Sequence, residues 1–423
     1  MCVVLFLADG GLARVTTLGG ALTAAGILTG LLATNALLLM LLLAARVPVI
    51  DRTLGQPRAT ALHSTLGDWV VYGLLAHGLL VLLGYLVLDN VSIITEFLYL
   101  WEASDFILAV VALGLLLAIV VSSVVAARRR LPYEVWHAIH LASYVAVGLS
   151  IPHMFSLSGL LAQGGWQRTY WIVLLCVVGA ALVGFRFLTP VVRSLRHRLR
   201  VVDVQPAGPD AFSIELAGRR LDRLGARSGQ YLHWRFLGKH LWWHQHPFSL
   251  SAAPRDDRLR ITVRDLGRGS AALRSVRLGT RVFIEGPYGS FTDRARTSDA
   301  VALVGAGIGI APIRALLEDA AFAPGDATVI LRASTPGELY LLDEIEPLCR
   351  RRGAALHLLT GSRSGDSWVP EESAGLTLAE LVPDLAGSDL YVCGPPGFSR
   401  LVVAEAEALG VPSRGIHVED FAW

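Results

Sequence analysis

Four histidines in the N-terminal half of the chain stand in two matched pairs within apolar stretches. His63 and His77 lie fourteen residues apart, and His140 and His153 lie thirteen apart. A histidine inside a membrane-spanning helix is costly and is a functional candidate by default. At a rise of about 1.5 Å per residue, the two histidines of each helix are about 20 Å apart along its axis. Two such helices can therefore offer two stacked bis-imidazole sites, of the kind that binds haem iron through axial histidines.

The histidine pattern leaves alternatives open. A lone histidine in a helical bundle is more often a hydrogen-bonded core residue, and only the matched spacing of four favours haem. Fourteen residues return to nearly the same helix face but thirteen do not, so His153 needs a kink, which Gly148 and Pro152 can supply. His137, one turn before His140, is a rival ligand. We assign His140 to the site because His137 lies nearest the preceding loop.

The composition divides the chain into two unlike halves. Its 423 residues are 53% hydrophobic with a mean hydropathy of +0.52, too apolar for an ordinary soluble protein. The excess lies in residues 17–190, whereas residues 191–423 read as a soluble α/β protein. A formal net charge of +2 gives no case for nucleic acid as a partner. The four cysteines have neither metal-site nor disulfide spacing.

Five apolar stretches are each close to the ~20 residues that a transmembrane helix needs. They are residues 18–44, 65–88, 105–126, 135–152 and 169–189. Arginines gather in the segments after the first, third and fifth stretches, whereas the other two loops are mainly acidic. The positive-inside rule then places the C-terminal half in the cytoplasm. We expect a multi-pass protein of the cell membrane, surrounded by membrane lipid.

The segment 200–293 has short alternating strands broken by glycine and proline, which predicts a small β-barrel. Four motifs lie within it: Gly229-Gln230-Tyr231, His246 to Ser251, Gly267 to Ser270, and Gly286 to Gly289. A glycine-rich turn with serine beside arginine can cradle a pyrophosphate through backbone N–H groups. The aromatic and serine run at His246 can lay a flat ring against the barrel. Each motif alone is equally explained by turn chemistry and core packing.

From about residue 299 the pattern changes to strands alternating with helices. The buried run 300–304 meets Gly305-Ala306-Gly307-Ile308-Gly309 and then a helix from Pro312 to Asp319. A strand, a glycine turn and a helix N-terminus together form a phosphate site, although GxGxG is not the GxGxxG fingerprint. The strand 328–331 ends in Arg332 and Ser334, and Arg363 follows a later strand. Arginine and serine suit a 2′-phosphate, which favours NADPH over NADH.

Taken together, these motifs resemble the ferric reductase and NADPH oxidase superfamily of transmembrane flavocytochromes, and the layout is similar to that of compact bacterial NADPH oxidases. The resemblance covers nearly the whole chain. His63, His77, His140 and His153 match the family's two-haem helices, and His246-Pro247-Phe248-Ser249 matches its flavin motif. The family usually has six helices, whereas five are predicted here.

The resemblance assigns the remaining site residues. It implies FAD contacts at Tyr231, His246, Pro247, Phe248, Ser249, Gly267, Gly269, Ser270, Gly286 and Tyr288. It implies nucleotide contacts at Gly305, Gly307, Gly309, Pro312, Arg332, Ser334, Arg363, Gly394 and Pro395. Cys393 is expected near the nicotinamide. Phe421 is expected to cover the flavin face and to move aside for the nicotinamide, as a gate.

The implied fold is a multidomain membrane protein. A helical transmembrane haem domain (1–192) is followed by a ferredoxin-reductase-like β-barrel FAD domain (198–296) and an α/β NADPH domain (297–423). NADPH, FAD and two b-type haems would pass electrons to an outer acceptor, dioxygen first and a ferric chelate second. A haem relay to a partner protein is an alternative, although no obligate partner is implied. A transporter lacks support because neither broken helices nor a repeat is seen.

Overall fold

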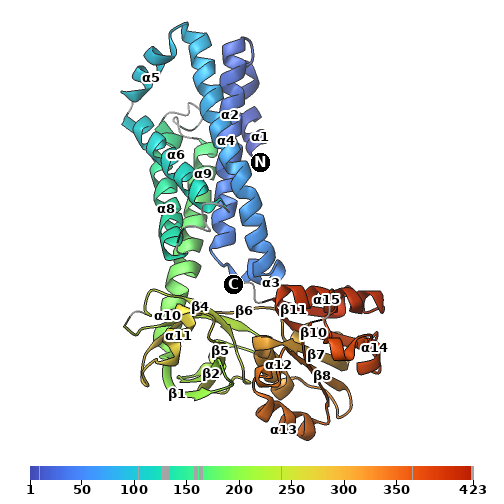
Figure 1. The fold of residues 1–423 in the computed structure, drawn as a ribbon. Coiled ribbons are helices and arrows are strands. Elements are labelled where there is room, and N and C mark those ends of the chain that lie inside the picture. The colour runs from blue at the N-terminus through green and yellow to red at the C-terminus, as the bar shows by residue number, and fades with distance from the viewer. Residues whose placement is uncertain are drawn as a thin grey trace. The chain divides into compact units, whose positions relative to one another are not determined.

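The computed structural model describes residues 1–8, 10–102, 104–124, 131, 133–156, 161, 165–239, 241–363 and 365–420. The chain divides into two compact units, Met1–Phe187 and Leu188–Trp423, and each is described by itself. Figure 1 labels their elements.

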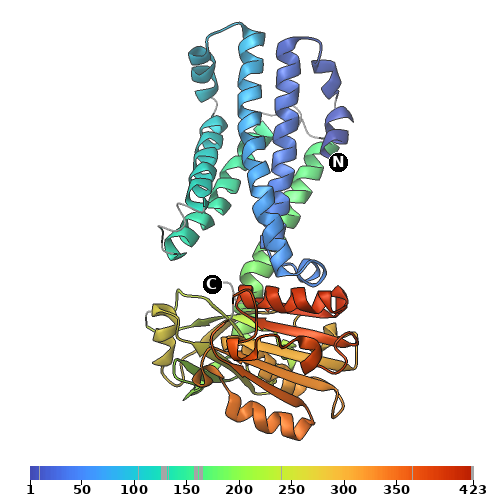
Figure 2. The same ribbon diagram turned by 45° about the vertical axis from the view of Figure 1, so that its right-hand side comes forward.

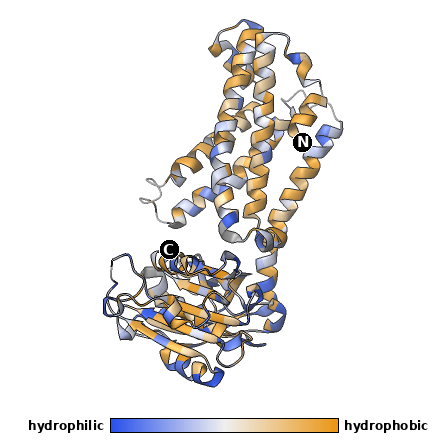
Figure 3. Ribbon diagram, turned by 90° about the vertical axis from the view of Figure 1, so that its right-hand side faces the viewer, coloured by the Kyte–Doolittle hydropathy of each residue, from blue (hydrophilic) through white to orange (hydrophobic). Residues whose placement is uncertain are grey.

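The first unit is helical. Its elements are α1 (Cys2–Ala8), a 3-10 turn (Gly11–Arg14), α2 (Leu18–Ala44), α3 (Pro48–Thr53), α4 (Gln56–Asp89), α5 (Ile93–Trp101), α6 (Ser104–Ser123), α8 (Tyr133–Ser156) and α9 (Trp166–Ala181). A π-helical segment, Leu182–Leu188, follows. Among the described residues, five helices are long and apolar enough to cross a membrane by length and composition, as predicted. Figure 3, a ribbon coloured by hydropathy, shows that these helices consist mainly of hydrophobic residues.

The helix boundaries differ from the predicted ones where a local signal competes with hydropathy. Helix α4 begins near its proline, well before the apolar run, because proline is tolerated in a first turn. Helix α8 continues through Pro152 to Ser156 and so includes His153. Helix α5 was not predicted; Ser92 caps it by accepting a hydrogen bond from the backbone N–H of Thr95.

Helices α2 and α4 pack closely through glycines. A Cβ built on Gly19 would lie 2.8 Å from a Leu88 side-chain atom, and one on Gly26 would lie 2.7 Å from Val81. Because the partner numbers fall as the α2 numbers rise, the two helices run antiparallel. Small residues are what lets helix backbones approach this closely in a membrane protein.

The second unit begins with α10 (Thr189–His197), followed by two antiparallel sheets. Strands β1 (Arg200–Pro206), β2 (Ala211–Ala217) and β5 (Arg258–Arg264) form one; β4 (His246–Ser249), β3 (Tyr231–Phe236) and β6 (Val282–Tyr288) form the other. Single bridges, Arg200 to Arg281 and Leu250 to Ile261, link the sheets. The strands are confirmed, but the sheets are open and a closed barrel is not established.

The rest of the second unit is a parallel five-stranded sheet in the order β11-β10-β7-β8-β9. The strands are β7 (Ala300–Ala306), β8 (Ala327–Ala333), β9 (Ala355–Thr360), β10 (Ser388–Gly394) and β11 (Ile416–Asp420). Alternate residues of β7 enter separate cores on the two faces. Helices α12 (Ile310–Asp319) and α13 (Leu342–Arg352) cover one face, and α14 (Leu378–Leu381) and α15 (Pro396–Ala408) the other (Figure 2).

Candidate functional site

The structure brings the four predicted histidine ligands together as two pairs between α4 and α8. The ring centroids of His63 and His140 are 6.1 Å apart, and those of His77 and His153 are 6.3 Å apart. A metal–imidazole bond of about 2 Å, with about 1.1 Å more from each nitrogen to its ring centre, gives about 6 Å between centroids across one metal ion. Both separations therefore fit axial ligation of one haem iron by each pair.

The ring nitrogens of the α8 histidines and the residues beside them also fit a role as metal ligands. The Nδ1 atoms of His140 and His153 are buried and find no hydrogen-bond partner among the described residues. The Trp136 ring lies beside His140, with centroids 5.2 Å apart. His137, the rival ligand, lies beside the same tryptophan, at 6.4 Å. The arrangement places His140 opposite His63.

Strand β4 holds the predicted flavin motif. The rings of His246 and Phe248, on the same side of the strand, stack with centroids 5.6 Å apart and planes 8° apart. The Nε2 atom of His246 and the Oγ atom of Ser249 are buried polar atoms without partners in the described structure. Burial, with a smaller effect of His244, lowers the pKa of His246 to about 4, so the ring is neutral at pH 7. Such orphaned polar atoms fit a site for a polar planar group.

The glycine motifs lie beside this strand. A Cβ on Gly269, in the first turn of α11 (Arg268–Arg274), would lie 3.3 Å from the His246 ring. The Ser270 hydroxyl accepts hydrogen bonds from the backbone N–H groups of Leu266 and Gly267. The Gly267–Ser270 turn is therefore ordered by its own serine next to the flavin motif.

Tyr231 and Tyr288 line a neighbouring part of the same sheet. They are paired residues of β3 and β6, with ring centroids 5.8 Å apart. The Tyr288 hydroxyl donates to the Glu285 carboxylate at 3.1 Å, and Arg193 donates to the carbonyl oxygen of Gly286. These contacts fix the Gly286 to Tyr288 segment in place.

Glu419 reaches this region from β11 and was not among the predicted site residues. Its carboxylate would lie 3.6 Å from a Cβ on Gly289, which would also contact the Tyr231 ring. Burial and the neighbouring Asp420 raise the pKa of Glu419 to about 7. The only sequence signal of Glu419 is its place near the end of the last strand, two residues before Phe421. Phe421, with its predicted gate function, lies outside the described residues.

The two nucleotide motifs meet at the carboxyl edge of the parallel sheet. Gly305 is the second-last residue of β7, and Gly394 ends β10, its direct neighbour. A Cβ on Gly309 would lie 2.8 Å from the backbone nitrogen of Gly394, so only glycine fits between the turns. The chain order reverses between these two strands, where open α/β sheets bind ligands. Helix α12, which contains Pro312, begins at this turn and directs its N-terminus toward it.

Arg332 does not lie where a 2′-phosphate could reach it. It is 6% exposed, and its guanidinium donates to the carbonyl oxygens of Trp368, Gly361 and Ala333. Burial lowers the pKa of Arg332. The backbone N–H of Ser334 donates to the Glu338 carboxylate at 3.2 Å. Arg332 therefore links the end of β8 to the segment that follows β9. Arg363, which is exposed, is the predicted arginine that remains for a phosphate.

Cys393 lies at the nucleotide edge but is fully buried. Its exposed fraction is 0%, and it pairs with Gly305 on one side and Glu419 on the other. Burial raises the pKa of the Cys393 thiol well above its usual range, so the thiol stays protonated. Arg363 approaches the neighbouring turn, with a guanidinium nitrogen 3.7 Å from a Cβ on Gly397. Cys393 thus shapes the edge by packing rather than acting as a nucleophile.

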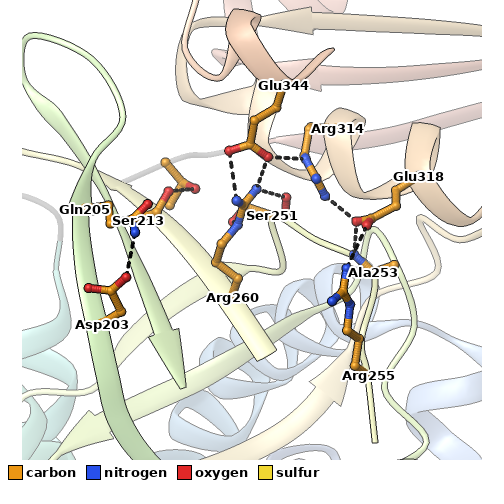
Figure 4. A network of polar contacts seen from close by, with 11 residues as sticks. Asp203, Gln205, Ser213, Ser251, Ala253, Arg255, Arg260, Arg314, Glu318 and Glu344 are labelled. Carbon is orange, nitrogen blue, oxygen red and sulfur yellow. Dashed lines mark hydrogen bonds and ion pairs between the residues drawn. The ribbon is translucent and has the colours of Figure 1, made fainter. Parts of the chain in front are cut away.

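A charged network, also absent from the sequence predictions, joins the antiparallel sheets to the parallel-sheet part of the second unit (Figure 4). Arg260 donates to both carboxylate oxygens of Glu344, at 2.8 and 2.9 Å, and to the carbonyl oxygen of Ser251. Arg314 of α12 contacts Glu344 and Glu318. The network thus ties the residues after the flavin strand to the helix that begins at the nucleotide turn.

Arg168, in the first turn of α9, has local partners. Its guanidinium donates to the carbonyl oxygen of Leu161 at 3.0 Å and lies over the Phe155 ring at 5.2 Å. These contacts are those of a charged residue at a helix end.

Family models match three successive parts of the chain. Residues 29–151 match a ferric reductase like transmembrane component, residues 197–292 an FAD-binding domain, and residues 303–404 an oxidoreductase NAD-binding domain. The first match ends two residues before His153 and includes the other three paired histidines.

Similar proteins match about half of the chain. A flavohemoprotein of Xylella fastidiosa is 29% identical over 204 residues, 46% of this chain and 51% of that protein. The reductase component of a Gordonia propane 2-monooxygenase is 28% identical over 234 residues, 52% of this chain and 66% of that protein. The chain spans about half the length of the flavohemoproteins it matches. A solved flavohem-like FAD/NAD-binding domain from Vibrio cholerae nitric oxide dioxygenase aligns with a TM-score of 0.45 and 25% identity, covering 53% of this chain and 99% of that one.

Proposed function

We propose that this chain, which has the three-domain architecture of the ferric reductase and NADPH oxidase superfamily, moves electrons from NADPH across a membrane to dioxygen. The matched domains are those of an NAD(P)H- and FAD-dependent oxidoreductase with a transmembrane component. Two haems, NADPH as the nucleotide, a cytoplasmic second unit and dioxygen as the acceptor are proposed in addition.

The observation that carries the proposal is the pairing of histidines in the first unit. Two pairs with centroids 6.1 and 6.3 Å apart, between the same two helices, suit two haems at two levels of one bundle. His63 and His140 would hold one haem, and His77 and His153 the other. A structural pair of histidines would instead be expected to share a hydrogen bond, and none is present within either pair among the described contacts.

The second unit would receive the hydride. When bound, FAD accepts two electrons as hydride and passes them on singly, which matches haem iron, a one-electron carrier. Neutral His246 and Ser249 would contact the flavin from β4, and the Gly267–Ser270 turn would cradle its pyrophosphate. The Gly305–Gly309 turn and the N-terminus of α12 would hold the nucleotide pyrophosphate. The preference for NADPH rests on Arg363, because Arg332 is occupied.

Orientation and acceptor follow from charge and family. By the positive-inside rule, the arginine-rich segments after the first, third and fifth helices support a cytoplasmic second unit in a protein of the plasma membrane. Electrons would then pass from the His63–His140 pair to the outer His77–His153 pair. Dioxygen, giving superoxide, is the proposed outer acceptor. A ferric chelate is the second candidate, favoured by the matched transmembrane component.

The first experiment is an optical spectrum of the detergent-purified protein before and after anaerobic addition of NADPH and FAD. Two haems per chain that become reduced support the internal relay, whereas a protein without haem contradicts it. Air is then admitted with cytochrome c as the reporter. Reduction of cytochrome c that superoxide dismutase suppresses supports dioxygen, and complete insensitivity to dismutase excludes superoxide as the product.

A further inference from the structure

We propose that backbone carbonyl groups of helix α2 orient the candidate haem ligands on α4, and that Gly30 is a positioning residue for the His77–His153 pair. Helix α2 contributes no histidine to either pair. The inference rests on the proposed function, because it concerns how haem ligands are held.

Each α4 histidine makes one hydrogen bond to α2. The Nδ1 atom of His77 lies 2.8 Å from the carbonyl oxygen of Gly26, and that of His63 lies 3.1 Å from the carbonyl oxygen of Met40. A carbonyl oxygen can only accept, so each Nδ1 must carry the proton. The Nε2 lone pair of each ring is then free for a metal, because the hydrogen bond of one ring nitrogen decides which nitrogen is metallated.

Both contacts follow from one helix register. Gly26 and Met40 are fourteen residues apart on α2, as are His63 and His77 on α4, and the helices run antiparallel. Fourteen residues are nearly four full turns of an α-helix. The same face of α2 therefore meets the same face of α4 at both levels, and one packing seam orients both rings.

Gly30 makes the hydrogen bond of His77 possible. A Cβ at this position would lie 2.6 Å from Nδ1 and 2.9 Å from Cε1 of the His77 ring. Real Cβ atoms do not approach a ring so closely, so any side chain there must displace the imidazole. Gly26 and Gly30 thus form a small-xxx-small pair in which Gly26 lies against α4 at Val81 and Gly30 admits the His77 ring.

The two helices differ in how they hold their ligands. In the described structure, the Nδ1 atoms of His140 and His153 on α8 have no hydrogen-bond partner. The α4 ligand of each pair is therefore oriented by the protein, and the α8 ligand is held by packing. Crowding at Gly30 is expected to disturb one pair and to leave the other intact.

The test compares Gly30→Ala with two matched alanine variants in the purified, haem-loaded full chain. Gly78→Ala adds a Cβ with nothing within 4 Å, directly beside His77 in sequence. Gly84→Ala crowds the same seam, against Thr23 and its backbone nitrogen at 2.7 Å, but touches no imidazole. The readouts are haem content per chain and the electron paramagnetic resonance signals of the ferric haems, which depend on the angle between the two ligand planes.

We expect Gly30→Ala to lose one haem or to shift one of two ferric signals, with the other unchanged. Gly78→Ala and Gly84→Ala should retain both haems with wild-type signals. Two unchanged signals in Gly30→Ala, or an equal change in Gly84→Ala, would overturn the inference. A wild-type protein without haem would instead refute the proposed function, so the two failures are distinguishable.

A second measurement needs no variant and covers the case in which Gly30→Ala does not fold. In the reduced wild-type protein labelled with ¹⁵N-histidine, the Nδ1 protons of His63 and His77 should exchange with solvent more slowly than the ring N–H protons of His140 and His153. Equal exchange within both pairs would contradict the proposed asymmetry. Slow exchange on α4 alone supports it.

Discussion

Arg260 of strand β5 holds Glu344 of helix α13 with two parallel hydrogen bonds, at 2.8 and 2.9 Å. Arg260 also donates to the carbonyl oxygen of Ser251, two residues past the flavin strand. This pair ties strand β5 to helix α13 of the parallel-sheet part of the second unit (Figure 4). Its side chains are 20% and 29% exposed, so it is only partly screened by solvent.

Removing Arg260 should therefore destabilise the second unit measurably. In Arg260→Met, Glu344 loses both hydrogen bonds from Arg260, and we expect a loss of about 1–3 kcal/mol in unfolding free energy. Arg258→Met is the matched control, because its bridge to Glu215 is exposed on the same strand and is worth about 0–1 kcal/mol. Unfolding is followed by flavin fluorescence in denaturant. Equal losses of unfolding free energy in both variants would show that the Arg260–Glu344 pair contributes no more stability than the exposed Arg258–Glu215 bridge.

Nucleotide preference should respond to Arg363 and not to Arg332. A charge-assisted hydrogen bond to a phosphate contributes about 1.5–3 kcal/mol, so Arg363→Ala should raise the KM for NADPH by about 10- to 100-fold and leave that for NADH unchanged. Arg332→Met removes three carbonyl contacts and should lower stability while affecting both nucleotides equally. Steady-state kinetics with both nucleotides measure this. A selective NADPH defect in Arg332→Met would reverse the assignment.

The ligand assignment on α8 predicts different effects for two neighbouring histidines. His140→Ala should lose the haem of the His63–His140 pair and retain the other, because one axial nitrogen is missing. His137→Ala should retain both haems. Haem content per chain is measured by the pyridine haemochrome assay. If His140→Ala keeps two haems and His137→Ala does not, His137 is the ligand.

The carboxyl group of Glu419 should make stability fall as the pH rises. Its pKa is raised from an unfolded value near 4.5 to about 7, so the folded protein binds the extra proton between these values. The contribution of Glu419 to the unfolding free energy is fully present below its unfolded pKa and is lost as the pH rises through about 7. Between pH 5 and 8, the flavin-release temperature of wild type should fall more steeply than that of Glu419→Gln. Glu407→Gln, an exposed change on α15, should follow wild type, and parallel curves for Glu419→Gln would contradict the prediction.

Patterns within a single element could be predicted from the sequence. Hydropathy located five long helices, and the matched spacing of His63, His77, His140 and His153 predicted two histidine sites between two helices. The glycine turns at Gly305 and Gly394 were recognisable because a turn next to a strand is a local signal. The pairing of β7 with β10 then placed both at one sheet edge.

What could not be predicted depends on contacts between distant residues. Arg332 resembles a phosphate ligand in sequence, but its burial is set by Gly361 and Trp368, which are 29 and 36 residues away. The Tyr340 hydroxyl donates to Asp210, 130 residues away, and no local pattern marks either residue. Glu419 carries no motif of its own, and its raised pKa exists only because folding buries it.

The orientation of His63 and His77 by α2 has a consequence for how such proteins are compared with one another. The acceptors at Gly26 and Met40 are peptide carbonyls, which every amino acid supplies. The identity of residue 40 can therefore drift among relatives without loss of the hydrogen bond, whereas position 30 must stay bare. A helix can thus orient two metal ligands through its backbone without requiring particular side chains. In its sequence, only the positions of its glycines indicate this role.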